Sequence, residues 1–248
     1  MRLILIVLSL LLSSGLTRGA TAGETCEVKV EGGLRYTLCS FDPAESVIRI
    51  YHRNPAGQPF GSFDSLIRQL WNERHTLIAA MNGGMYHADL SAVGLFIEHG
   101  IERQAISTKG GWGNFHLLPN GVFWLEDGKA GVTEASRFTG RGLKPDYATQ
   151  SGPMLVIDGE IHPRFLADSD SLKIRNGIGV DEKGRVHMLI SEVPVRFYDF
   201  ALLFRDGLGC RNALYLDGTI SSLYAASTGR RDHLFPLGPI IAVIGTLP

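Results

Sequence analysis

The chain has 248 residues, of which 44% are hydrophobic, and its formal net charge is −1. This length allows a large core within one domain. The near-neutral charge and the scattered Lys and Arg residues exclude the basic footprint of a nucleic-acid-binding protein, so we expect no nucleic-acid partner.

The first residues have the pattern of a secretory signal peptide. Met1-Arg2 precedes an apolar run over 3–12, and small residues follow around Ala20-Thr21-Ala22. This order is typical of a signal peptide spanning residues 1–22, and the run is shorter than the roughly 20 residues that cross a bilayer. We therefore expect residues 23–248 to form the mature domain, periplasmic or secreted, with no stable membrane anchor.

Three cysteines lie in that mature part. Cys26 and Cys39 flank two alternating segments joined by Glu31-Gly32-Gly33, a pattern that predicts a hairpin. A hairpin brings its ends together, so these two cysteines are expected to form a disulfide in an oxidising compartment. Cys210 is left over and is interpreted as a small core residue rather than a nucleophile.

Strand-like segments recur through the rest of the chain, separated by glycine-containing turns. They are Val28–Val30, Arg35–Leu38, Val47–Tyr51, Thr76–Met81, Gly94–Ile97, Phe115–Leu118, Val122–Leu125, Met154–Ile157, Gly177–Val180, Val186–Ile190, Ala213–Leu216 and Ile240–Ile244. Asn120-Gly121 and Asp158-Gly159 are interpreted as hairpin turns without a chemical role.

Two segments show helical spacing of their apolar residues. Ser62–Arg74 begins at a plausible N-cap, Ser62, and Arg196–Leu208 is followed by a stop at Gly209. Together with the strands they predict a single, strand-rich α+β domain, with a mostly antiparallel or mixed twisted sheet covered by two helices.

Polar, glycine-rich residues interrupt the buried strands at four places. The first is Met81–His87, where Asn82 can donate and accept, and where Gly83 and Gly84 allow close backbone approach or positive φ. The alternative is a plain turn, and for His87 a solvated loop residue is the commoner case.

The second and third places precede strands. Ser151-Gly152-Pro153 is ordinary turn chemistry and a weak signal by itself. Arg175 stands directly before Gly177–Val180, and an arginine there could clamp a phosphate or carboxylate, or be an ordinary residue at a strand edge.

The fourth place comes after the buried run Ala213–Leu216. Asp217 and Gly218 form a tight turn, and the hydroxyls of Ser221 and Ser222 come soon after. This arrangement suits acid–base chemistry or binding of an anionic oxygen, but Asp-Gly is also a common turn dipeptide.

Taken in order, these segments resemble the phosphodiester glycosidase family. Asn82-Gly83-Gly84-Met85, the segment 151–159 from Ser-Gly-Pro to Asp-Gly, Arg175 with Ile178-Gly179-Val180, and the segment 213–218 ending in Asp-Gly match its motifs. The resemblance covers about 76–248. The family usually continues Asp-Gly-Gly-Gly-Ser, whereas this chain has Thr219 and Ile220 after Gly218, and β-branched residues disfavour positive φ.

The resemblance implies hydrolysis of a glycosyl phosphodiester through an oxocarbenium-like state. Asp217 would attack the anomeric carbon or activate water, Arg175 would hold the departing phosphate, and Glu192 is the best-placed second carboxylate. Asn82, His87 and Ser221 would orient sugar hydroxyls or phosphate oxygens, and the matched Gly83, Gly84, Ser151, Gly152 and Gly218 would line the substrate.

Other functions stay open at this point. No His and Cys cluster has zinc-ligand spacing, so we expect no cofactor, while a divalent cation between Asp217 and the phosphate remains an alternative. The substituted turn after Gly218 favours a second hypothesis, a non-catalytic cell-envelope module that binds a glycan or a phosphate-bearing polymer.

Overall fold

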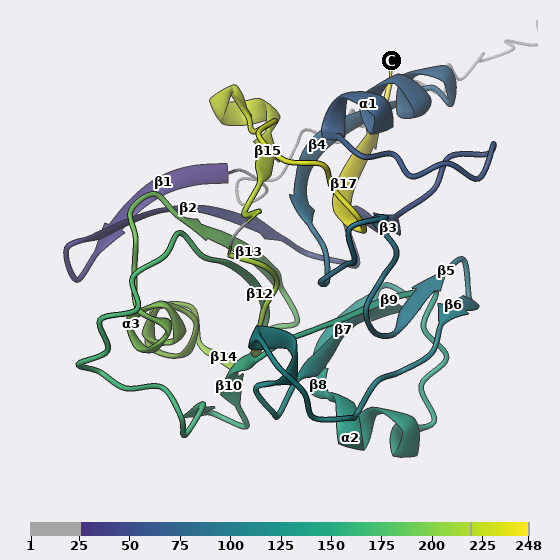
Figure 1. Ribbon diagram of the computed structural model, residues 1–248. Helices are drawn as coiled ribbons and strands as arrows, with labels where there is room; N and C mark the ends of the chain where they lie inside the picture. Colours follow the sequence, from purple (N-terminus) through teal and green to yellow (C-terminus); the bar gives the residue numbers. More distant parts are fainter. Residues whose placement is uncertain (1–25, 219, 248) are drawn as a thin grey trace, which may run out of the picture.

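The structure is a computed structural model that describes residues 26–218 and 220–247 (Figure 1). The expected signal peptide and Thr219 lie outside these residues. Within them the chain is strand-rich, with three antiparallel sheets and few helices. The prediction of a strand-rich α+β fold is confirmed. No helix in the described part of the chain is long and apolar enough to cross a membrane.

The largest sheet has seven strands in the order β1-β2-β13-β12-β14-β10-β11. Alternating or continuous apolar residues form all of them, and β13 is buried along its whole length. Their bounds are β1 Cys26–Glu31, β2 Leu34–Phe41, β13 Val186–Ser191, β12 Asn176–Asp181, β14 Cys210–Tyr215, β10 Met154–Ile157 and β11 Glu160–Ile161.

Two five-stranded sheets complete the architecture, in the orders β16-β15-β4-β17-β3 and β6-β5-β9-β7-β8. The first contains β16 Arg230–Arg231, β15 Leu223–Ala225, β4 His75–Asn82, β17 Ile240–Thr246 and β3 Val47–Tyr51. The second contains β6 Ile101–Gln104, β5 Phe96–Glu98, β9 Tyr147–Ser151, β7 Gly121–Glu126 and β8 Lys129–Glu134.

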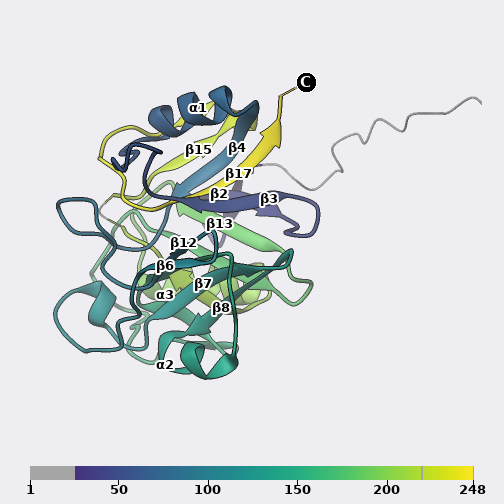
Figure 2. The ribbon, with the colours of Figure 1, turned by 90° about the vertical axis from the view of Figure 1, so that its right-hand side faces the viewer.

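The three sheets pack their inner faces around one central core, which includes Met81, Phe123 and Ile190. Each outer face is covered by one helix: α1 (Phe63–Asn72), α2 (Ala135–Phe138) and α3 (Phe197–Leu202) (Figures 1 and 2). The two helices expected from the sequence are α1 and α3. The short α2 was not expected.

Local sequence signals explain the ends of both main helices. The Ser62 hydroxyl accepts a hydrogen bond from the Ser65 amide at 3.2 Å, so Ser62 is the N-cap of α1. A π-helical turn, η3 (Leu203–Gly207), extends α3, and Gly209 then ends the segment with a φ of 66°. Both predicted helix boundaries are thus correct to within a few residues.

The predicted disulfide is confirmed. Cys26 and Cys39 pair directly across the β1–β2 hairpin, with their Cα atoms 4.0 Å apart. Cys210 is buried and free, and burial raises the pKa of its thiol to about 12. A thiol that stays protonated is a poor nucleophile, in agreement with a packing role.

Two local predictions are wrong. The segment expected as the strand Phe115–Leu118 forms a short 3₁₀ turn, η1 (Asn114–His116), because its amides bond to carbonyls three residues back or nearer. Asn120-Gly121 is no hairpin turn, since Asn120 is buried, donates to the Phe115 carbonyl and accepts from Gln150. Asp158-Gly159 does join β10 to β11, with φ values of 51° and 95°.

Candidate active site

Two buried asparagines join the large sheet to its neighbour. Asn82 is the last residue of β4 and Asn176 the first of β12, and both are 0% exposed. The side-chain Nδ2 group of Asn176 donates a hydrogen bond to Asn82 Oδ1 at 2.7 Å. Because burial of polar groups requires hydrogen-bond partners, this pair fixes how the ends of the two strands meet.

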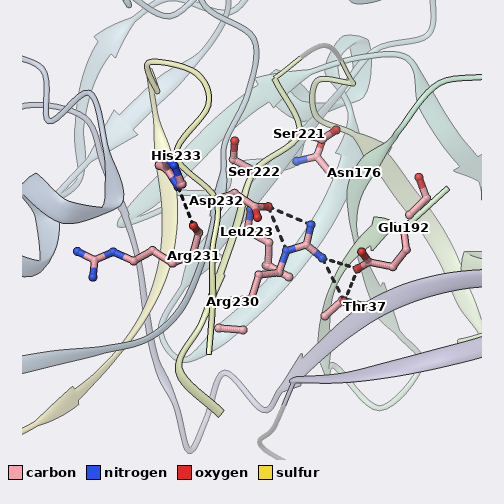
Figure 3. A network of polar contacts seen from close by, with 12 residues as sticks. Thr37, Asn176, Glu192, Ser221, Ser222, Leu223, Arg230, Arg231, Asp232 and His233 are labelled. Carbon is pink, nitrogen blue, oxygen red and sulfur yellow. Dashed lines mark hydrogen bonds and ion pairs between the residues drawn. The ribbon is translucent and has the colours of Figure 1, made fainter. Parts of the chain in front are cut away.

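The Asp217 loop is attached to the same pair. The Asp217 amide donates to Asn176 Oδ1 at 3.0 Å, and the Ser222 amide donates to Asn82 Oδ1 at 2.9 Å. The Ser221 hydroxyl bridges Asn176 Oδ1 and the Asp217 carbonyl at 3.3 and 3.0 Å. Figure 3 shows Asn176, Ser221 and Ser222 together at this junction. The loop is therefore held by side chains from two sheets.

One donor at this junction has no partner among the described residues. Asn82 Oδ1 accepts two hydrogen bonds, which sets the orientation of the amide, and the Asn82 Nδ2 atom is buried without an acceptor. A buried, unpaired donor costs free energy unless something binds it. Asn82 thus supplies a donor ready for a ligand oxygen or an ordered water.

Two tyrosines lie close enough to Asp217 to respond to its charge. Burial, followed by the Asp217 charge, raises the pKa of Tyr215 to about 12. The same two causes, in the same order, raise the pKa of Tyr86, whose hydroxyl donates to the Pro236 carbonyl at 2.5 Å. Both phenols stay protonated around a half-buried Asp217 carboxylate. Neither tyrosine was expected from the sequence.

A charged network lies next to the Asp217 loop, on residues of β2, β15 and β16 and at the end of β13. Glu192, directly after β13, accepts from the Thr37 hydroxyl at 2.5 Å and pairs with Arg230. Arg230 also pairs with Asp232 at 3.0 Å, and Asp232 accepts from the Leu223 amide at 2.9 Å. These contacts connect β2, β13 and the β15–β16 hairpin (Figure 3).

All three charged groups of that network are partly exposed, with 21–27% of each side chain accessible. Glu192, expected as the second carboxylate, is therefore present but already paired to a cation. Arg230 and Asp232 were not expected from the sequence, where their only local signal is a short charged run, Arg230-Arg231-Asp232, after Gly229.

Arg175 differs in placement from the expected phosphate clamp. It is 1% exposed, and its guanidinium donates to the Val195 and Ser171 carbonyls at 2.9 and 3.0 Å. The group lies 3.5 Å from the centre of the Phe197 ring, and burial lowers its pKa. The expectation of an arginine open to a departing phosphate is wrong, because backbone carbonyls and aromatic rings occupy its surroundings.

The matched glycines near Asn82 are needed for close packing. Neither Gly83 nor Gly84 has a positive φ. A Cβ on Gly84 would lie 2.1 Å from the Gln150 carbonyl oxygen, and one on Gly83 would lie 3.1 Å from the Pro239 oxygen. The expected positive φ is wrong, and what these glycines approach closely in this structure is protein backbone.

The second motif is brought to the same place. The Ser151 hydroxyl is buried and donates to the Leu216 carbonyl at 2.7 Å, directly before Asp217. Gly152 precedes a cis peptide bond to Pro153 and packs against Asn120, where a Cβ would approach to 2.7 Å. The Ser151 hydroxyl therefore stabilises the backbone before Asp217 rather than contacting a ligand.

His87 lies in an exposed turn, where its amide donates to the Ser91 carbonyl at 2.8 Å. Besides burial, the Asp217 charge contributes to the raised pKa of the neighbouring residue Tyr86. The structure thus brings together Asn82, Asn176, Asp217 and Ser221, with Glu192 in the flanking network.

No metal-ligand cluster marks the site in the described part of the chain. No group of three His, Cys, Asp or Glu side chains there could hold a metal ion. A cavity of about 680 Å³ lies between β3, α1 and β5–β6, and none of the predicted site residues lines it. The candidate site is therefore defined by its convergent polar groups.

Comparison with known proteins identifies the family of this chain. Residues 75–238 match the family described as phosphodiester glycosidase. The chain belongs to the phosphodiester glycosidase family. It is 32% identical over 225 residues to the uncharacterized protein YigE of Escherichia coli (strain K12), covering 90% of this chain and 87% of that protein.

Solved structures agree on the fold. The zebrafish N-acetylglucosamine-1-phosphodiester alpha-N-acetylglucosaminidase catalytic domain, auto-inhibited by its pro-peptide, superposes with a TM-score of 0.61 at 13% identity, covering 88% of this chain and 81% of that one. A hypothetical protein from Synechocystis gives 0.57 at 14%, covering 88% and 61%. The family supports a hydrolase of the phosphodiester glycosidase kind.

Proposed function

We propose that this protein is an exported hydrolase that cleaves the glycosidic bond of a sugar-1-phosphodiester and releases the sugar and a phosphomonoester. One observation carries the proposal: the four motif segments, far apart in sequence, converge around Asp217. Asn82, Asn176 and Asp217 are linked by direct hydrogen bonds, and the Ser151 hydroxyl donates to the Leu216 carbonyl directly before Asp217. Side chains that converge from several segments are typical of an active site.

Asp217 is the reacting carboxylate in this proposal. It either attacks the anomeric carbon or removes a proton from the attacking water, while the bond from that carbon to the phosphate oxygen breaks. The phosphomonoester leaves with the bonding electron pair, and water supplies the new sugar hydroxyl. Tyr215, which is protonated, and the free Asn82 amide proton provide donors around the developing charges.

The arginines receive different parts. Arg175 is a positioning residue, because its guanidinium lies against Phe197 and faces the Tyr215 ring at 5.9 Å. Arg230 is the more accessible cation, held between Glu192 and Asp232 on the hairpin that follows the Asp217 loop. We assign to Arg230 the interaction with the departing phosphate.

Export is part of the proposal and rests on two features. The pattern of residues 1–22 is that of a signal peptide, and the Cys26–Cys39 disulfide suits an oxidising compartment. We accordingly propose a periplasmic or secreted location and a cell-envelope glycan phosphate as substrate.

The test is release of phosphomonoester from a panel of sugar-1-phosphodiesters, followed by mass spectrometry. Asp217→Asn should lower kcat by at least about a thousandfold, because it removes the reacting group. Asp168→Asn, at an exposed position, is the matched control and should leave turnover unchanged. Full activity of Asp217→Asn would refute the site, and saturable binding without any released sugar would favour the non-catalytic module.

A further inference from the structure

The segment between β6 and β7 holds the most exposed large hydrophobic side chain of the described residues. Trp112 is 98% exposed, in the run Gly110-Gly111-Trp112-Gly113. Burial of a large apolar side chain is worth about 1.5–3 kcal/mol, and the Trp112 ring lies almost wholly in water. A ligand that covered this ring would gain that free energy.

The loop that presents Trp112 is held in place at its start. The buried Gln150 side chain accepts from the Ser107 amide at 2.9 Å and donates to the Ser107 carbonyl at 2.5 Å. Gln150 also accepts from the Leu95 amide at 2.9 Å. This side chain therefore ties the loop to the end of β9.

The loop is held again next to its tip. His116 Nδ1 lies 2.9 Å from the Lys109 carbonyl oxygen, and the His116 ring packs so closely on Gly111 that a Cβ there would approach to 2.8 Å. The His116 ring in turn packs edge-on against the buried Phe115 ring. A loop fixed on both sides of Trp112 presents a defined surface.

This loop is linked to the candidate active site through Gln150. Gln150 is the neighbour of Ser151, whose hydroxyl contacts the Leu216 carbonyl next to Asp217. The Gln150 carbonyl also packs against Gly84, two residues after Asn82. In Figure 2 the loop after β4 and the loop before β7 project on the same side of the sheets, at the left of the view.

A second hollow lies under the same loop. It has a volume of about 320 Å³ and is lined by Thr108, Leu118, Pro119, Asn120, Glu134 and Ser136. This lining combines the apolar Leu118 and Pro119 with hydroxyl, amide and carboxylate groups, a mixture that suits a sugar, which has apolar C–H faces and hydroxyl edges.

We propose that residues 105–116, with Trp112 at the tip, form a glycan subsite that binds a sugar ring of the substrate outside the bond that is cleaved. The proposal rests on the proposed function and narrows the substrate to a glycan phosphate of more than one sugar. A protein partner or a membrane would require a wide apolar patch, whereas the neighbours Thr108, Lys109 and Asn114 are polar.

Turnover of two substrates tests the subsite. One is the methyl phosphodiester of N-acetylglucosamine-1-phosphate. The other is an oligomer of four N-acetylglucosamine-1-phosphate units joined by phosphodiester bonds. Trp112→Ala should lower kcat/KM for the oligomer by roughly five- to tenfold, mainly through KM, and change the small substrate by less than about twofold. Trp112→Tyr should restore most of the loss, and Trp71→Ala, at the 64% exposed tryptophan of α1, is the matched control.

Equal effects of Trp112→Ala on both substrates would overturn the subsite. Binding is measured separately by tryptophan emission, with the Asp217→Asn variant and the same oligomer. The oligomer should shift the emission in this variant and in its Trp71→Phe derivative, but not in its Trp112→Phe derivative. No Trp112-dependent shift would overturn the subsite even if hydrolysis occurs, and a shift without hydrolysis by the wild type would refute the proposed function alone. Trp112-dependent binding to anionic phospholipid vesicles, without a response to the oligomer, would overturn the subsite and assign the loop to membranes instead.

Discussion

The buried asparagine pair allows a quantitative test of the site architecture through Asn82→Ala. Asn82 Oδ1 accepts from Asn176 Nδ2 and from the Ser222 amide, so alanine leaves two buried donors without an acceptor. Each unpaired buried donor costs about 1–3 kcal/mol, which gives a loss of about 2–6 kcal/mol in the free energy of unfolding.

A compensating gain reduces this figure. Asn82 Nδ2 is itself buried without a partner among the described residues, and alanine removes it, which returns about 1–3 kcal/mol. The expected net destabilisation is therefore about 1–3 kcal/mol, from two lost acceptor contacts against one removed orphan donor. Ligand binding that depends on the free amide proton should be lost as well.

Asn82→Asp separates the two roles. The aspartate keeps an acceptor oxygen for both donors, and in its ionised form it presents no proton to a ligand. Burial raises the pKa of the new carboxyl above the value of about 3.9 in the unfolded chain, so the folded state binds the proton more tightly. The stability of this variant should then be greatest at low pH and fall as the pH rises toward 7.

Urea unfolding followed by far-UV circular dichroism at pH 5 and pH 7 measures both variants. Asn72→Ala, at the exposed end of α1, is the control and should change stability by less than about 0.5 kcal/mol. An Asn82→Ala midpoint equal to that of the wild type would refute the reasoning. So would an Asn82→Asp variant whose stability relative to the wild type is the same at both pH values.

Two further predictions concern packing and pH. Gly84→Ala should destabilise the protein by at least about 1–3 kcal/mol, because its Cβ would lie 2.1 Å from the Gln150 oxygen. Gly140→Ala is the control, since a Cβ there meets nothing within 4 Å. Equal urea midpoints for the two variants would contradict this prediction. Burial lowers the pKa values of His52, His162 and His187, so the folded state binds fewer protons than the unfolded state below about pH 6.5. The stability that these histidines contribute should be fully present above that pH and fall as the pH drops toward 5. In urea titrations at a series of pH values, His162→Gln should make this fall shallower. The same dependence of the unfolding free energy on pH in the variant and the wild type would contradict the prediction.

The fold was predictable where local chemistry decides it. Helical spacing and a serine cap located α1, and two glycines between alternating segments located the β1–β2 hairpin and its disulfide. The segment 115–118 misled because its apolar run is typical of a strand, while tertiary contacts bury Phe115 in a 3₁₀ turn. Short polar strands such as β6, exposed along its length, leave no hydrophobic pattern to detect.

The site was predictable only in part, because long-range pairing is invisible in one sequence. The order of motifs indicated Asn82, Asp217 and Ser221, which do converge. Arg230 meets Thr37 across 193 residues, and nothing near either residue announces that contact. The predicted role of Arg175 was wrong for a related reason. An arginine before a strand can bind either a phosphate or backbone carbonyls, and only the packing of Phe197 on the guanidinium shows which of the two it binds.

The packing of Gly218 bears on the difference from the family's usual Asp-Gly-Gly-Gly-Ser sequence. It explains why Asp217 can keep its position although the residues after Gly218 are not glycines. Gly218 has no positive φ, and a Cβ there would lie 2.1 Å from the Tyr215 hydroxyl and 2.9 Å from the Ile174 carbonyl. Space rather than a left-handed backbone requires glycine at this position. The Asp217 amide donates to Asn176 Oδ1 before the chain reaches the substituted positions, and the Ser221 amide closes the loop on the Gly218 carbonyl at 3.3 Å. We therefore expect the β-branched residues after Gly218 to affect which substrate enters rather than where Asp217 lies.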